Sequence, residues 1–124
     1  MSEKYNGWTN YETWNVKLWM NNDQGSYTYY RELSQECYDQ AEASERPTFT
    51  REEQATLDLS QRLKDEYETA SQDWLKESGK SASVWADLIG AALSEVNWHE
   101  IAEALIEDVD KEEAEPEEEE AEAE

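Results

Sequence analysis

The sequence has little of what enzymes use to build reactive centres. Its 124 residues include one cysteine, Cys37, and one histidine, His99. A lone cysteine cannot form an internal disulfide, which is typical of proteins kept in a reducing cytoplasm. A zinc site of the usual type needs several cysteine or histidine ligands. The four glycines are isolated, so no glycine-rich phosphate loop is present.

The two residues with nucleophile or base chemistry do not form a recognisable motif. Cys37 and His99 could meet in space as a nucleophile and a base. However, Cys37 falls on the apolar stripe of an expected helix, as an inert buried thiol does, and His99 falls in the first turn of another. No carboxylate pair stands out among 32 acidic residues, and Asp108 and Asp110 lack the downstream glycine of an EF-hand. We therefore predict no catalytic residue, no metal site and no cofactor.

Long apolar runs are also missing. No run approaches the ~20 residues of a membrane span, and the first residues lack the apolar segment of a signal peptide. We expect the protein to remain in the cytoplasm where it is made.

Positive charge is scarce. The chain has 10 basic and 32 acidic residues, giving a net charge of -22, and no Lys or Arg lies between Lys80 and Lys111. Such a charge repels nucleic acid and anionic membranes and attracts basic surfaces, so we expect no direct binding to nucleic acid or membrane. The charge is interpreted either as a solubilising surface, including adaptation to high salt, or as an acidic docking face.

What is present is helical periodicity, without the alternation typical of strands. We predict an all-α domain over residues 1–110, in which about five helices form a small bundle. The order in which the helices pack is left open. The expected helices run from Thr9 to about Asn21, Ser26 to about Ser44, Thr50 to about Ser78, Ser81 or Ser83 to about Val96, and Asn97 to about Val109. Residues 111–124 are nine Glu, three Ala, one Lys and one Pro. Like charges repel there and nothing apolar offsets chain entropy, so we predict a disordered polyglutamate tail.

Local signals support these helices. Thr9 with Glu12, and Thr50 with Glu53, are typical of capping boxes, and Gly79 suits a helix C-terminus. The third helix has the most regular apolar stripe, which we expect to bury against the first and fifth helices. Its members are Ala55, Leu59, Leu63, Tyr67, Ala70 and Trp74. The second and fourth helices have stripes of Tyr30, Leu33, Cys37 and Ala41, and of Val84, Trp85, Leu88, Ala92 and Val96.

Two residue sets are candidates for binding. The first is the outward face of the fifth helix, which holds Glu100, Glu103, Glu107 and Asp110 without a compensating base. The second is an aromatic cluster formed by Trp8, Tyr11, Trp14 and Trp19. We favour a structural role for the aromatic residues, in a central first helix buried on two sides. The alternative is an exposed aromatic hot spot for a protein partner.

Two segments resemble a known type of protein. The segment Gly7–Val16, GWTNYETWNV, resembles the opening of a family of small proteins from phages, plasmids and some prokaryotic genomes. The segment Ala92–Ala102, ALSEVNWHEIA, is similar to an ending that recurs among them. This resemblance implies no catalytic residue. By composition alone, the chain also resembles small acidic phage proteins that act as DNA mimics against restriction enzymes.

These observations favour a non-enzymatic binding protein. The leading hypothesis is a phage- or plasmid-type accessory protein, in the host cytoplasm, that inhibits a basic DNA-binding or defence protein by DNA mimicry. Carboxylates at i,i+4 lie about 6 Å apart along a helix, and DNA carries one charge per ~1.7 Å over both strands. The alternatives are an interaction module that uses the aromatic residues, with acidity serving solubility or high-salt adaptation, and an acidic chaperone for a basic protein. Glutamate outnumbers aspartate 24 to 8 and the acids cluster at one end, which argues against high-salt adaptation.

Overall fold

The computed structural model describes residues 5–41 and 50–111. Five helices make up most of these residues: α1 (Tyr11–Asn22), α2 (Gln24–Gln40), α3 (Arg51–Glu77), α4 (Val84–Glu95) and α5 (Trp98–Glu107). Within the two described ranges there is no strand, only an isolated bridge between Tyr5 and Trp8. The predicted all-α fold of five helices is confirmed. The predicted polyglutamate tail falls on residues 112–124, outside the described residues.

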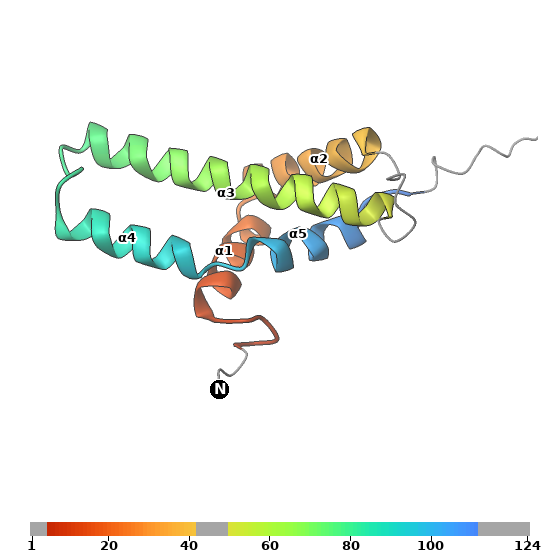
Figure 1. Ribbon diagram of the computed structural model, residues 1–124, viewed down its shortest axis with the longest axis horizontal. Helices are drawn as coiled ribbons and strands as arrows, with labels where there is room; N and C mark the ends of the chain where they lie inside the picture. The colour runs from red at the N-terminus through yellow and green to blue at the C-terminus, as the bar shows by residue number, and fades with distance from the viewer. Residues whose placement is uncertain (1–4, 42–49, 112–124) are drawn as a thin grey trace, which may run out of the picture.

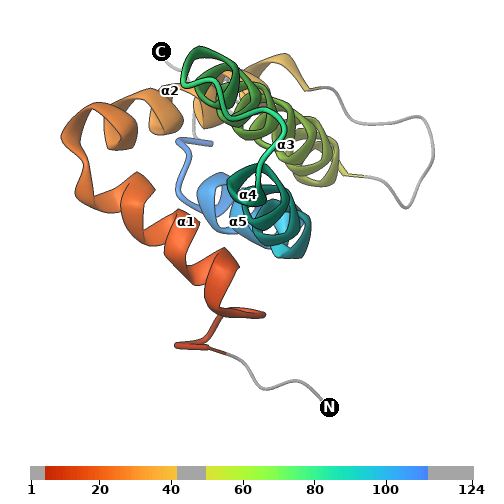
Figure 2. The ribbon, with the colours of Figure 1, turned by 90° about the vertical axis from the view of Figure 1, so that its left-hand side faces the viewer.

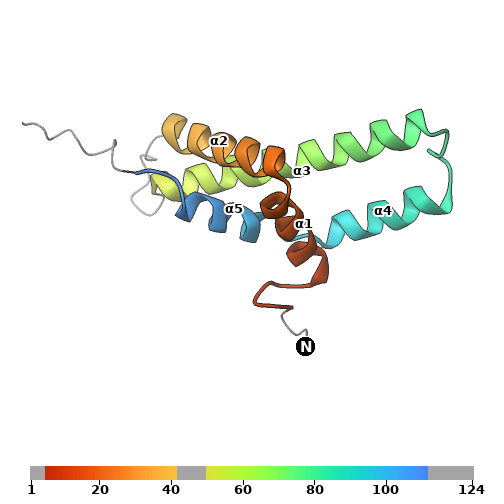
Figure 3. The same cartoon turned by 180° about the vertical axis from the view of Figure 1, so that it is seen from behind.

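The long helix α3 organises the other four. Its first half lies beside α2 and α5, and α4 runs antiparallel to its second half (Figure 1). Seen from behind, α1 crosses near the junction between α4 and α5 (Figure 3). The second half of α3 from Glu68, the following turn and α4 together project beyond the other helices, and we call this two-helix projection the arm.

The core lies between the first half of α3, α2 and α5. Leu59 and Leu63 of α3 and Ile101 of α5 are fully buried, which confirms the inner part of the predicted α3 stripe. The expected partners of α3 were partly wrong. It contacts α5, α2 and α4, and α1 contacts α2, α4 and α5 instead. The reason is that α2 folds back from α1 and takes the place beside α3 that we expected α1 to fill.

Helix α1 begins one residue later than predicted. Asn10, rather than Thr9, is its N-cap, because the Asn10 side chain accepts a hydrogen bond from the Thr13 amide at 2.9 Å. Thr9 is engaged elsewhere, since its own amide donates to Glu100 at 3.0 Å. The sequence motif was therefore located correctly but assigned to the wrong capping residue.

Helix α2 also begins earlier than predicted. Asp23 caps it by accepting from the Ser26 amide at 3.0 Å, so Ser26 lies inside the first turn rather than at the cap. Asp23 is the only residue between α1 and α2, which leaves no room for the longer turn that we expected. Helix α2 ends at Gln40 with Ala41 as C-cap, before the expected end near Ser44, and residues 42–49 are outside the described ranges.

The signals around α3 are confirmed. Thr50 and Glu53 form the predicted capping box. Gly79 has φ +72, and Lys80 donates to the Leu75 carbonyl at 2.8 Å while Gly79 donates to Lys76 at 3.1 Å. These two bonds are those of a Schellman motif.

The boundaries of α4 and α5 agree only in part with the predicted ones. Ser83, not Ser81, caps α4. Helix α5 ends at Glu107, two residues before the predicted Val109.

The arm differs most from expectation. Helix α4 has no buried residue, and Trp74, Trp85 and Leu88 are 54%, 53% and 55% exposed. The predicted burial of the outer stripe was therefore wrong. The physical reason is geometric. Helices α2 and α5 cover only the first half of α3, and of the described helices outside the arm only α1 reaches α4, where Asn10 donates to the Glu95 carbonyl at the C-terminal end of α4 (Figure 2).

Candidate functional site

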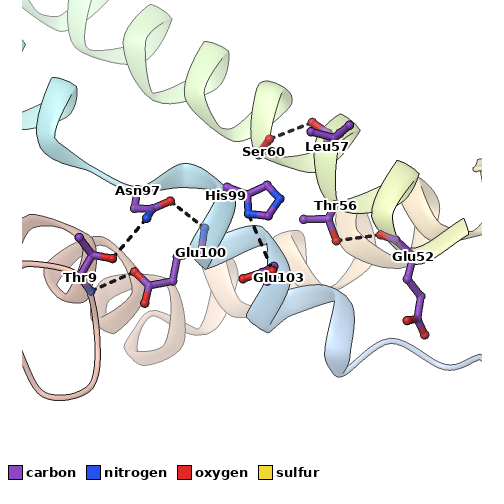
Figure 4. Close-up of polar contacts among 9 residues, drawn as sticks. All are labelled: Thr9, Glu52, Thr56, Leu57, Ser60, Asn97, His99, Glu100 and Glu103. Atoms are coloured by element: carbon purple, nitrogen blue, oxygen red, sulfur yellow. Dashed lines mark hydrogen bonds and ion pairs between the residues drawn. The ribbon is translucent and has the colours of Figure 1, made fainter. Parts of the chain in front are cut away.

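An acidic surface groove lies between exposed side chains of the start of α3 and of α5. Its volume is about 700 Å³. Figure 4 shows Glu52 and Thr56 on one side of this region and His99 and Glu103 on the other. The full lining is Thr50, Glu52, Glu53, Thr56, Leu57, His99, Glu103, Ile106, Glu107 and Lys111.

The lining of the acidic groove is strongly negative. Four carboxylates and one lysine give it a net charge of -3 with His99 neutral. Lys111 Nζ lies 3.1 Å from Glu52 Oε2, and His99 Nδ1 lies 3.9 Å from Glu103 Oε2. Both pairs are largely exposed to solvent, where an ion pair contributes little. A cationic side chain of a partner would therefore meet more negative than positive charge here.

Local sequence explains how the carboxylates reach the groove. Glu52 and Glu53 occupy the first turn of α3, where acids favour the helix N-terminus. Glu103 and Glu107 are four residues apart on the exposed side of α5, so they lie on one face. The opposite face of α5 buries Ile101, Ala102, Leu105 and Ile106.

Only two of the four residues in the predicted acidic set line the groove. Glu103 and Glu107 line the groove, but Glu100 is half-buried and accepts a hydrogen bond from the Thr9 amide. Asp110 lies beyond the end of α5, where its amide donates to Gln35 Oε1 at 2.9 Å.

Two groove carboxylates, Glu52 and Glu53, were missed from the sequence. The capping box marked their position on α3 but could not indicate which helix they would face.

A polar junction holds α1 against the start of α5. Thr13, fully buried, accepts from the Asn97 amide at 2.8 Å and donates to Asn10 Oδ1 at 2.6 Å. The Asn97 side chain donates to Thr9 Oγ1 at 3.2 Å and accepts from the Glu100 amide at 3.0 Å. The two segments that carry the resemblance thus meet in space, and their polar residues serve the fold (Figure 4).

The aromatic residues of α1 and its approach are only partly buried. Trp8 packs against the core, and the Trp14 ring lies 4.9 Å from that of Tyr5 and 5.5 Å from that of Tyr11. Trp19 is 63% exposed. The expectation of a central helix buried on two sides was wrong, because only Thr13 and Met20 of α1 are buried.

Cys37 and His99 lie in different surroundings. Cys37 is buried on α2 and lines a small hollow with Asp58 and Arg62, among others. Burial raises the pKa of its thiol, although the Arg62 guanidinium opposes this. His99 lines the acidic groove instead.

Within residues 5–41 and 50–111, no three His, Cys, Asp or Glu side chains are grouped so that they could hold a metal ion. None of the helices in those ranges is both long and apolar enough to cross a membrane.

Fold and groove together define an all-α protein with an acidic surface cleft. The chain belongs to DUF7249, a family of unknown function, whose model matches residues 1–120. The match includes both the polar junction and the acidic groove. No curated protein and no solved structure matches the chain.

Proposed function

We propose that the protein acts by binding rather than by catalysis, with the acidic groove docking on a basic, DNA-binding surface of another protein. The observation that carries this proposal is the arrangement of four carboxylates on two helices around one cleft. A lysine or arginine side chain entering the groove would have Glu52 and Glu53 on one side and Glu103 and Glu107 on the other. Charge-assisted hydrogen bonds of this kind are roughly twice as strong as neutral ones.

The same geometry supports the proposal that the protein imitates DNA. Rows of carboxylates on two helices border the groove, as two rows of phosphates border a groove of DNA, where one charge occurs per ~1.7 Å of axis. The net charge of -22 extends the negative potential beyond the groove. Because the chain resembles phage- and plasmid-encoded proteins, the proposed target is a DNA-binding or defence protein of the host cytoplasm, which the protein would inhibit.

A second candidate function is an aromatic interaction module. Trp19 supports it, because a tryptophan that is 63% exposed on a helix is a common anchor at protein interfaces. On this alternative, the acidity would serve solubility or high-salt adaptation.

The test is capture of a partner from a bacterial lysate, followed by binding kinetics with the purified partner. We expect binding to weaken as salt rises, because exposed charges are screened, and duplex DNA to compete. The double variant Glu103→Lys, Glu107→Lys should lose affinity by about tenfold or more, since unlike charges across the interface become like charges.

A matched control separates the groove from total charge. Asp73→Lys with Asp87→Lys changes the net charge equally, but both residues are on the arm and exposed. This control should lose affinity by less than about threefold. Equal losses for both double variants, or binding that neither salt nor DNA affects, would contradict the groove proposal. Loss of binding in a stable Trp19→Ala variant would favour the aromatic module instead.

A further inference from the structure

The arm carries an apolar face that continues the core. Tyr67 and Val96 pack in or against the core cluster. Trp74 follows Tyr67 by seven residues, and Trp85 precedes Val96 by eleven. At 3.6 residues per turn, both spacings return to the same side of a helix. The side of α3 that faces the core at Tyr67 therefore also carries Trp74. The side of α4 that faces the core at Val96 also carries Trp85.

The middle of this face is free of charge, and its two ends are bordered by Glu77, seven residues after Ala70, and Glu95, seven residues after Leu88. On α3 it holds Tyr67, Ala70 and Trp74, and on α4 it holds Trp85, Leu88 and Ala92. Asp87 is two residues from Trp85 and so points about 200° away around the helix. In a chain of net charge -22, an uncharged face of this length is the surface that a second acidic molecule can approach with least repulsion.

No other part of the chain is suited to cover the arm. Residues 42–49 join α2 to Thr50, at the opposite end of α3. Trp74 is ~36 Å from that end at 1.5 Å per residue, which exceeds the ~29 Å that eight residues span at full extension. Residues 112–124 have no aromatic or branched apolar side chain, and residues 1–4 have only Met1 as a large apolar residue.

We propose that the arm is a dimerisation element, whose uncharged face packs against the same face of a second copy of this chain. Two helices from each copy then form a four-helix arrangement, which closes the apolar layer that each arm leaves open. A two-fold axis makes such a contact self-complementary, because the same residues meet from both copies.

The size of the face sets the strength of the dimer. Helix α4 has 12 residues, so the arm offers a face ~18 Å long and ~20 Å wide, a footprint of roughly 400 Å². A standard interface buries about 800 Å² per partner. The contact is about half of that, below the range of stable interfaces and within that of weak, transient ones, so we expect a dissociation constant on the order of 100 µM.

The test is the mass of the full chain in solution, by sedimentation equilibrium from about 1 to about 500 µM, a range that brackets a dissociation constant on the order of 100 µM. We expect the mass to rise from 14.5 kDa towards twice that value. High salt should favour the dimer, because it screens the repulsion between two acidic copies. This dependence is opposite in sign to that of the proposed groove partner, so the two proposals fail independently.

Variants locate the interface. Trp85→Glu places a charge on the face and should raise the dissociation constant by about tenfold or more, with circular dichroism showing that the helices are retained. Ser94→Glu is the matched control, since Ser94 is exposed on the same helix but lies nine residues from Trp85, on the opposite side, and it should change the constant by less than about threefold. If Trp85→Glu does not fold, Trp74→Glu makes the same test from α3.

Two results would overturn the proposal. A chain that stays monomeric at every concentration and salt would leave a different protein as the occupant of the arm. Equal effects of Trp85→Glu and Ser94→Glu would place the interface elsewhere. Groove variants that carry Lys at positions 103 and 107 should dimerise at least as well as the unmodified chain, because they lower the net charge.

Discussion

At the scale of single residues, Thr13 connects the two ends of the folded chain. It is fully buried in α1, and its hydroxyl acts as both acceptor and donor within the polar junction. A buried polar group costs stability unless it is hydrogen-bonded. The junction satisfies the Thr13 hydroxyl, the Asn97 amide and the Asn10 side chain together.

Thr13→Val should therefore destabilise the protein without changing its shape. Valine has nearly the same volume, but it leaves the Asn97 amide without its acceptor, at a cost of roughly 1–3 kcal/mol. Thr28→Val on the exposed side of α2 is the control and should cost less than about 0.5 kcal/mol. Urea unfolding measures both. Equal costs would mean that the junction contributes nothing specific.

The sequence revealed the polar motif but not the role of each residue in it. Thr9, Asn10 and Thr13 all suit a helix start, and local chemistry alone favoured Thr9 as the cap. The roles are decided by Asn97 and Glu100, which are 84 to 91 residues away from their partners in the chain. Glu100 was placed on the binding surface for the same reason, since only the folded chain brings Thr9 to it.

At the scale of elements, the two halves of α3 should respond differently to truncation. Leu63 is fully buried, so Leu63→Ala should cost roughly 2–5 kcal/mol in the free energy of unfolding. Trp74 is 54% exposed in the arm, so Trp74→Ala should cost less than about 1 kcal/mol in the monomer. Urea titrations at low protein concentration compare the two. A loss below about 0.5 kcal/mol for Leu63→Ala would contradict the described core.

The start and end of α3 and the buried side of α5 were predictable because neighbouring residues determine them. The Thr50 capping box, the Gly79 motif and the buried side of α5 all depend on residues within one or two turns. The exposure of Trp74 and Trp85 depends instead on how far α2 and α5 extend along α3. A periodic apolar stripe indicates that a surface is suited to be covered, but it does not indicate that the same chain covers it.

At the scale of the whole molecule, the uneven charge should act mainly on the rate of association. Deleting residues 112–124 removes nine glutamates and changes the net charge from -22 to -13. If the proposed function is right, the association rate with a basic partner should fall several-fold, because long-range attraction steers the encounter. The dissociation rate should change little, since the groove carboxylates remain.

Stopped-flow mixing at two salt concentrations measures this effect. The difference between the full and shortened chains should shrink at high salt, where steering is screened. An unchanged association rate, or a large rise in the dissociation rate, would show that the proposed steering role is wrong.

The acidic character was evident from the sequence, but its concentration into a groove was not. Glu103 and Glu107 were identified from the outward face of α5, and Glu52 and Glu53 only after α3 and α5 were seen side by side. Helix pairing is a property of the whole chain, and no local pattern encodes it.

The polar junction also has a consequence for synthesis on the ribosome. Chains grow at roughly 5–20 residues per second, so Asn97 is made about 4–17 s after Thr13, whose hydroxyl it binds. During that interval α1 has no fifth helix to contact, and Trp8 lacks part of the core against which it packs. A nascent chain halted before residue 97 would therefore present its aromatic N-terminal segment to chaperones and proteases.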